Sequence, residues 1–258
     1  MPIITNPNAI LNGYTFDFPT LKCVQKYFNI QLKPRQVYRL GSGKFAPYHK
    51  SSTIFNNIPD LVGFDFPVLL YSKGESKGTV CILGQDALRD PKDPKLRNIN
   101  INNDIPIGFP YAISFESTYK NVMIYHNLVK CLLDSGYNVY LTDVWKSWDV
   151  MHLSRLGIWN NNNPHKQCLI CEFNTLPIDY VILMGRTAKN KFNSIKQFIS
   201  KVPVEIEIPH LSPSNNGTWA KIKLKYGKNK KDYIKEKLEE SGIEINCPNC
   251  PVANTLEE

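Results

Sequence analysis

The 258-residue chain is 42% hydrophobic and 21% charged, a balance that supports a full apolar core and excludes a disordered or fibrous protein. No apolar run approaches the roughly eighteen residues of a membrane span, and the first residues lack the pattern of a secretory signal. The net charge of +8 favours anionic partners, with nucleic acid first and anionic lipid or acidic protein second.

We expect one domain over residues 1–258, with 1–75 as an N-terminal extension packed on it and 243–258 as a C-terminal tail. We also expect a monomer in the cytoplasm, associated with the nucleoid if the source is bacterial. The extension contains one predicted amphipathic helix, whose apolar positions are Leu21, Val24 and Phe28.

Four short runs rich in β-branched and apolar residues are predicted to be strands: residues 79–83, 138–141, 180–183 and 204–208. The first and third are almost continuously apolar, as expected for strands buried on both faces. A helix over 122–133, with Ser117 or Thr118 as N-cap, is predicted to end at Gly136. Thr187 is predicted to cap a second helix, on which the apolar positions are Phe192, Ile195 and Ile199.

This alternation of strands and helices predicts an α/β protein, folded as a three-layer α/β/α sandwich with a mostly parallel, four-stranded central sheet. Near the C-terminus, residues 221–226 alternate lysine with apolar residues and predict a half-buried strand with a lysine face. Residues 230–241 are predicted to form a charged helix that ends at Gly242.

Polar residues follow each of the four predicted strands. They are Gly84-Gln85-Asp86, Thr142-Asp143, Gly185-Arg186-Thr187 and Pro209-His210. Because ligands bind beyond the carboxyl ends of the strands in open α/β sheets, these residues are expected to converge on one edge.

The same segments, in the same order, resemble motifs of the uracil-DNA glycosylase superfamily across residues 78–215. Gly84-Gln85-Asp86 is similar to the water-activating motif of the common branch, and 108–113 is similar to the segment whose aromatic residue stacks on the base. Residues 140–146 and 183–188 resemble the iron–sulfur branch. His210-Leu211-Ser212-Pro213 resembles the closing catalytic motif.

The resemblance implies cleavage of an N-glycosidic bond after a base has been flipped out of DNA. It implies that Asp86 positions water and stabilises the cationic sugar, while His210 stabilises the departing base anion. The implied substrate-binding residues are Gly84, Gln85, Tyr111 as stacking platform, Asp143 as reader of the base edge, and Ser212 as a phosphate contact. Each has a structural alternative: Asp86 as a turn former, His210 as a packed side chain, Tyr111 as core.

Two departures from the family bear on the substrate. Ala87-Leu88-Arg89 replaces Pro-Tyr-His, so the tyrosine that excludes thymine is absent. Asp143 replaces an asparagine, and an ionised carboxylate only accepts hydrogen bonds. This acceptor suits an exocyclic amine better than O4 of uracil, unless burial protonates Asp143. From the sequence we therefore predict weak activity on uracil and an increase in uracil release on Asp143→Asn.

The seven cysteines, an odd number, indicate mostly free thiols in a reducing compartment. Two C-x-x-C pairs have spacing that suits structural zinc: Cys168, Cys171, Cys247 and Cys250. The first pair has a plain core position as its alternative. No other cofactor is expected, because Ser147 and Trp148 stand where the iron–sulfur branch needs a cysteine.

A lysine-rich segment follows the closing motif. Four residues are candidates for contact with DNA phosphates: Ser214, Lys221, Lys223 and Lys225. The alternative for the lysines is a solvated surface.

Three functions stay open: a DNA glycosylase for uracil or another deaminated or modified base, a catalytically weak or inactive member that binds nucleic acid or nucleotide, and an unrelated α/β hydrolase or transferase. The third lacks a phosphate-binding glycine-rich loop and a Gly-x-Ser-x-Gly motif.

Overall fold

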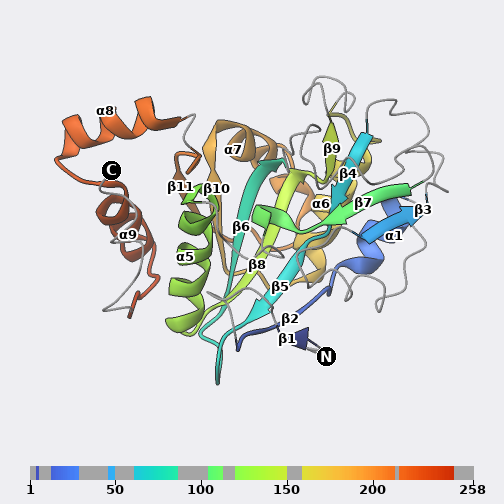
Figure 1. Cartoon of the computed structure of the whole chain (residues 1–258), viewed down its shortest axis with the longest axis horizontal. Coiled ribbons are helices and arrows are strands. Elements are labelled where there is room, and N and C mark those ends of the chain that lie inside the picture. The colour runs from blue at the N-terminus through green and yellow to red at the C-terminus, as the bar shows by residue number, and fades with distance from the viewer. Residues whose placement is uncertain are drawn as a thin grey trace.

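The computed structural model describes residues 4–5, 13–28, 46–49, 61–86, 104–112, 120–149, 159–212 and 215–246. Their backbone forms an α/β protein with a mixed, mostly parallel central sheet and a second, smaller sheet (Figure 1). No helix in these ranges is long and apolar enough to cross a bilayer.

Four parallel strands form the centre of the main sheet. They are β6 (Thr79–Asp86), β8 (Asn138–Trp145), β10 (Tyr180–Met184) and β11 (Val204–Ile208). Their order is β8-β6-β10-β11, and every neighbouring pair is parallel. All four strands predicted from the sequence are confirmed.

The prediction of a four-stranded sheet is wrong, because three further strands continue it beyond β8. They are β5 (Val68–Tyr71), β2 (Thr15–Asp17) and β1 (Ile4–Thr5), each antiparallel to its neighbour. The runs that form them are only two to four residues long. Strands this short acquire their identity from pairing across the sheet, which no local periodicity signals.

Helices pack against both faces of this sheet. Along β6, Val80 and Ile82 join one apolar cluster and Cys81 and Leu83 join the other, because successive side chains point to opposite faces. The first cluster includes residues of α5 (Lys120–Asp134) and α9 (Lys230–Glu240), and the second those of α6 (Pro164–Thr175) and α7 (Gly185–Asn193).

Two helices end at glycines with positive φ, at the positions predicted from the sequence. Gly136 follows α5 with φ 93° and Gly242 follows α9 with φ 86°, and both predicted ends are confirmed. The predicted cap at Thr187 is wrong. Helix α7 already begins at Gly185, whose φ of 82° lets the chain turn directly from strand into helix.

The predicted strand over 221–226 is also wrong, because these residues belong to helix α8 (Asn216–Tyr226). Alternation over six residues is too short to distinguish the two periods. The helix is anchored by Trp219, which is its buried residue, while Leu224 is 87% exposed. In Figure 1, α8 lies at the outer margin of the molecule.

The helix predicted near the N-terminus is confirmed as α1 (Leu21–Phe28). The smaller sheet was not predicted and has the order β3-β7-β4-β9. Its strands are β3 (Ala46–His49), β7 (Asp104–Gly108), β4 (Leu61–Asp65) and β9 (Ser147–Asp149). Two short 3-10 helices complete the described elements: η2 (Pro110–Ala112) and η4 (Lys196–Phe198).

Candidate active site

The strand order places a topological switch point at the carboxyl ends of β6 and β10. After β6 the chain passes to β8 on one side and then crosses to β10 on the other, so the connections diverge at this point. Such a switch point is where open α/β sheets bind ligands. Gly84, Asp143, Gly185 and His210 lie at or just beyond the carboxyl ends of the four parallel strands, so the structure brings these predicted residues to one edge.

Three of the residues meet directly over β6. Gly84 and Asp143 are neighbours in the parallel ladder between β6 and β8. A Cβ atom placed on Gly84 would lie 2.2 Å from Asp143 Oδ1 and 2.6 Å from the Tyr111 hydroxyl. The carboxylate and the phenol therefore occupy the space that a side chain at residue 84 would take.

Tyr111 reaches this point from η2 with an unusual backbone. Its φ of 56° is the only positive value of a non-glycine residue in the described part of the chain. Its ring stacks on Tyr125 of α5, with centroids 4.9 Å apart and planes inclined by 27°. Burial, and next to it the charge of Asp143, raises the pKa of Tyr111 well above its ordinary value, so the phenol is neutral at neutral pH.

His210 follows β11 and is held by its own loop. The Ser212 backbone N–H donates to His210 Nδ1 at 3.2 Å, and the Ser212 hydroxyl lies 2.9 Å from the same nitrogen. Because a backbone N–H can only donate, Nδ1 is the acceptor and the neutral ring carries its proton on Nε2. Burial lowers the pKa of His210, which favours this neutral form.

Neighbouring elements fix the position of this histidine. The Trp219 indole N–H donates to the His210 carbonyl at 3.1 Å, which ties α8 to the end of β11. The Tyr125 hydroxyl lies 3.4 Å from Nδ1 and links the histidine to the Tyr111 stack. A Cβ on Gly185 would lie 3.3 Å from His210 Cβ, so the glycine permits this close approach.

A buried ionic network lies on the α6 side of β8. The Lys146 ammonium is 3.0 Å from Glu172 Oε1 and donates to the Thr142 hydroxyl at 2.8 Å and to the Asp143 carbonyl at 2.6 Å. Thr142 in turn donates to Glu172 Oε2 at 2.9 Å. Both charged side chains are 0% exposed. The network therefore holds the backbone of Asp143 from the face of the sheet opposite to its side chain.

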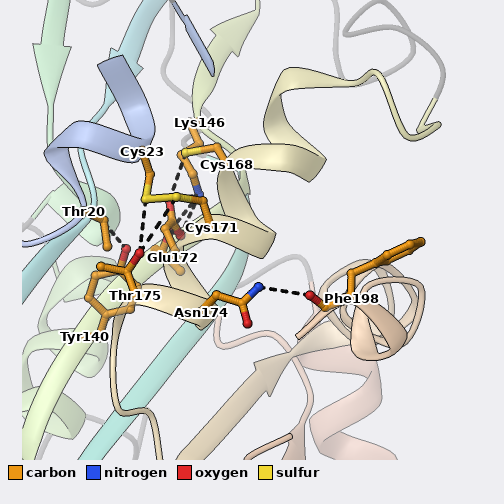
Figure 2. Close-up of a disulfide and its surroundings, with 11 residues drawn as sticks. Thr20, Cys23, Tyr140, Lys146, Cys168, Cys171, Glu172, Asn174, Thr175 and Phe198 are labelled. Carbon is orange, nitrogen blue, oxygen red and sulfur yellow. Dashed lines mark hydrogen bonds and ion pairs between the residues drawn. A yellow bond between two sulfur atoms is a disulfide. The ribbon is translucent and has the colours of Figure 1, made fainter. Parts of the chain in front are cut away.

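Helix α6 presents two further groups to this network, as Figure 2 shows for one of them. The Cys168 thiol donates to Glu172 Oε1 at 3.3 Å. His165 Nδ1 accepts from the Lys146 backbone N–H at 3.0 Å. Burial, and after it the charge of Lys146, lowers the pKa of His165 to about 3, so its ring is neutral.

The structure pairs Cys171 with Cys23 of α1 in a disulfide (Figure 2). The expected zinc site therefore needs this bond to be reduced, and its other half, Cys247 and Cys250, lies outside the described residues. The remaining cysteines of the described part, Cys81, Cys131 and Cys168, are buried and form no disulfide. No cluster of potential metal ligands occurs within the same part of the chain.

The other predicted site residues are placed as follows. The backbone of Asp86 ends β6 opposite Trp145, whereas its side chain and Ser214 lie outside what the structure describes. Gln85 is partly buried. The three predicted DNA contacts on α8 are exposed: Lys221, Lys223 and Lys225.

Sequence reasoning missed Tyr125 and Glu172 as parts of this region. Tyr125 occurs in the apolar periodicity of its helix, and that signal marks only burial. Glu172 is an isolated charge in α6, with no local sign of a buried cation beside it. No protein-family model matches this chain, and no curated protein matches it either.

Proposed function

We propose that this chain is a DNA glycosylase of the uracil-DNA glycosylase superfamily type, which hydrolyses the N-glycosidic bond of a flipped-out uracil or other deaminated or modified base. The observation that carries the proposal is the neutral His210 with its proton on Nε2, at the same strand edge as Asp143, Gly84 and the Tyr111–Tyr125 stack. Helices on both faces of a parallel sheet also fit the three-layer sandwich of this class.

The proposed reaction uses a donor and a carboxylate at opposite ends of the breaking bond. As the bond between C1′ and the base breaks, its electron pair moves to the base, and the His210 Nε2–H donates a hydrogen bond to the resulting anion. Asp86, which follows Gly84 at the end of β6, positions water for attack on C1′ and stabilises the cationic sugar. Water supplies the hydroxyl that remains on C1′ and the proton that neutralises the base.

The base enters this site only after leaving the DNA stack. The proposed base-binding site excludes water. The burial of Asp143, which is 3% exposed, supports this. In the proposed complex, the lysines of α8 contact the phosphates of the bound strand. Their exposure, and the position of α8 soon after the His210–Ser212 loop, support this role.

The test is incubation with single- and double-stranded oligonucleotides that carry a panel of deaminated and modified bases, followed by alkaline cleavage of abasic sites. We expect release of at least one base, reduced about 100-fold or more by His210→Gln and by Asp86→Asn. Glu207→Gln is the matched control, because Glu207 lies on β11 in an exposed ion pair with Lys189.

The same experiment separates the alternative, a member that binds nucleic acid without cleaving it. Such a protein would retain the modified oligonucleotide in a binding assay and release no base from it. Release that is unchanged in both His210→Gln and Asp86→Asn would contradict the proposed chemistry.

A further inference from the structure

The Tyr111 hydroxyl is a buried polar group that lacks a hydrogen-bond partner in the described structure. Native proteins rarely leave such a group unsatisfied, so its presence at a candidate binding edge points to a ligand atom. The backbone strain at Tyr111 supports this, because a bulky residue is seldom held at φ 56° without a functional constraint.

The hydroxyl lies beside an acceptor of complementary character. Tyr111 OH and Asp143 Oδ1 both lie within 2.6 Å of the position that a Cβ on Gly84 would take. The phenol is neutral and can donate, whereas an ionised carboxylate can only accept. One donor and one acceptor therefore lie over the same glycine.

We infer that Asp143 and Tyr111 form a divided base-reading pair over Gly84, in which the carboxylate accepts from an N–H of the flipped-out base and the phenol donates to the acceptor next to it. Together the two side chains present the donor and acceptor that a single amide would present. This inference rests on the proposed function and names its substrate class as a base edge with an N–H beside an acceptor.

Pyrimidines carry such an edge in two forms, and thymine shares the form of uracil. Uracil presents N3–H beside O4, and cytosine presents its exocyclic amine beside N3. The pair thus removes the objection to uracil that Asp143 alone raises, since the donor that Asp143 lacks is supplied by Tyr111. The stack on Tyr125 fixes the direction of the phenol, which is what a reading group requires.

The test measures binding, so that it is independent of catalysis. Oligonucleotides carry one 2′-fluoro nucleotide, whose glycosidic bond resists cleavage, with uracil, N3-methyluracil or cytosine as the base. An oligonucleotide with a tetrahydrofuran abasic site is the reference. We expect the wild-type protein to bind either the uracil or the cytosine oligonucleotide about 10-fold more tightly than the reference.

Tyr111→Phe keeps the ring stack and removes the donor, and is expected to reduce that preference about 3- to 10-fold, the value of one hydrogen bond. For a uracil reader, N3-methylation abolishes the preference. Asp143→Asn, introduced into the Tyr111→Phe protein, then restores it because the amide brings its own donor. For a cytosine reader, the cytosine preference decreases in both variants. Tyr137→Phe is the control, because its hydroxyl lies at the opposite end of β8 and accepts from the Glu244 backbone.

Either pattern supports the pair and identifies its base. The inferred pair is overturned if the wild-type and Tyr111→Phe proteins prefer the base-carrying oligonucleotide over the abasic reference to the same degree. It is also overturned if the wild-type protein binds no base more tightly than that reference. Base release in the oligonucleotide panel decides the proposed function separately, since a glycosylase that reads its base by other groups would cleave while showing no effect of Tyr111→Phe.

Discussion

Asp143 lies beside Gly84 in the parallel ladder, and its Oδ1 occupies a position only 2.2 Å from where a side chain at residue 84 would begin. Residue 84 must therefore be glycine because no room exists for a side chain, and not because its backbone adopts a positive φ. Any side chain there must displace the carboxylate, the Tyr111 phenol, or both.

Gly84→Ala is predicted to separate Asp143 from Tyr111 and to weaken base binding at least 10-fold. Overpacking of a buried site also lowers the free energy of unfolding by about 1–3 kcal/mol. Urea unfolding and binding of the 2′-fluoro oligonucleotides measure the two effects. Gly217→Ala is the control, because beyond the local backbone of α8 no atom lies within 4 Å of the new methyl; it should leave base binding unchanged and should not lower the unfolding free energy. Full base binding by Gly84→Ala would contradict the convergence.

Lys146 and Glu172 form an ion pair that is fully removed from water. Lys146→Met leaves the Glu172 carboxylate without its cation and is predicted to cost about 3–5 kcal/mol of unfolding free energy. The double variant with Glu172→Leu should cost clearly less than Lys146→Met alone, because no uncompensated charge stays buried. Chemical denaturation of all three variants completes the cycle.

The exposed pair Lys189–Glu207 provides the comparison for that cycle. Its alanine variants should change the unfolding free energy by less than about 1 kcal/mol, because water screens exposed charges. Additive effects of Lys146→Met and Glu172→Leu would show that the buried pair is not coupled.

The disulfide between Cys23 and Cys171 closes a loop with a sequence separation of 148 residues and joins α1 to α6. Its loss is predicted to lower the unfolding free energy by about 2–4 kcal/mol, chiefly by freeing the unfolded chain. Urea unfolding with and without a dithiol reductant measures this. The Cys23→Ala/Cys171→Ala protein should not respond to the reductant, and alkylation of native wild-type protein should label neither cysteine until it is reduced. Labelling of either before reduction would contradict the bond.

The neutral His165 makes stability depend on pH in the acidic range. Its pKa is about 3 in the folded protein, against an ordinary value near 6.5 when unfolded. The unfolded chain therefore binds the additional proton first as the pH falls. The stability from this residue is complete above pH 6.5 and is lost towards pH 3, at up to about 1.4 kcal/mol per pH unit. Unfolding free energies at pH 7, 6, 5 and 4 should fall less steeply for His165→Asn, and equal slopes would refute the assignment.

The lysines of α8 are exposed, and none of the ion pairs seen in the described residues involves Lys221, Lys223 or Lys225. Replacing all three by Gln is predicted to weaken DNA binding for every sequence alike and to reduce the salt slope by about 1 per lost phosphate contact. The control carries the same charge change at three lysines that already pair with carboxylates: Lys77, Lys235 and Lys237. Equal salt slopes in the two triple variants would exclude α8 from the interface.

Local pattern was sufficient for the central strands and for the helix ends at Gly136 and Gly242. The apolar runs of β6 and β10 are signatures of strands covered on both faces, and Gly136 and Gly242 follow helices because only glycine readily adopts positive φ. The sequence pattern gave the wrong prediction where the segment was short. Residues 221–226 alternate as a strand would, but Trp219, which precedes them, docks against the end of β11 and holds the segment as a helix.

The sequence by itself determined which polar residues follow the parallel strands, since strand identity and order along the chain are local properties. Only the tertiary structure decided how those residues meet. Tyr111, 27 residues after Gly84, places its hydroxyl over that glycine because η2 and α5 carry it there. The proton on His210, the cation beside Glu172 and the partner of Cys171 are likewise set by groups distant in sequence. Hydrogen bonds, ion pairs and disulfides act over a few ångströms in space, and separation along the chain does not encode that distance.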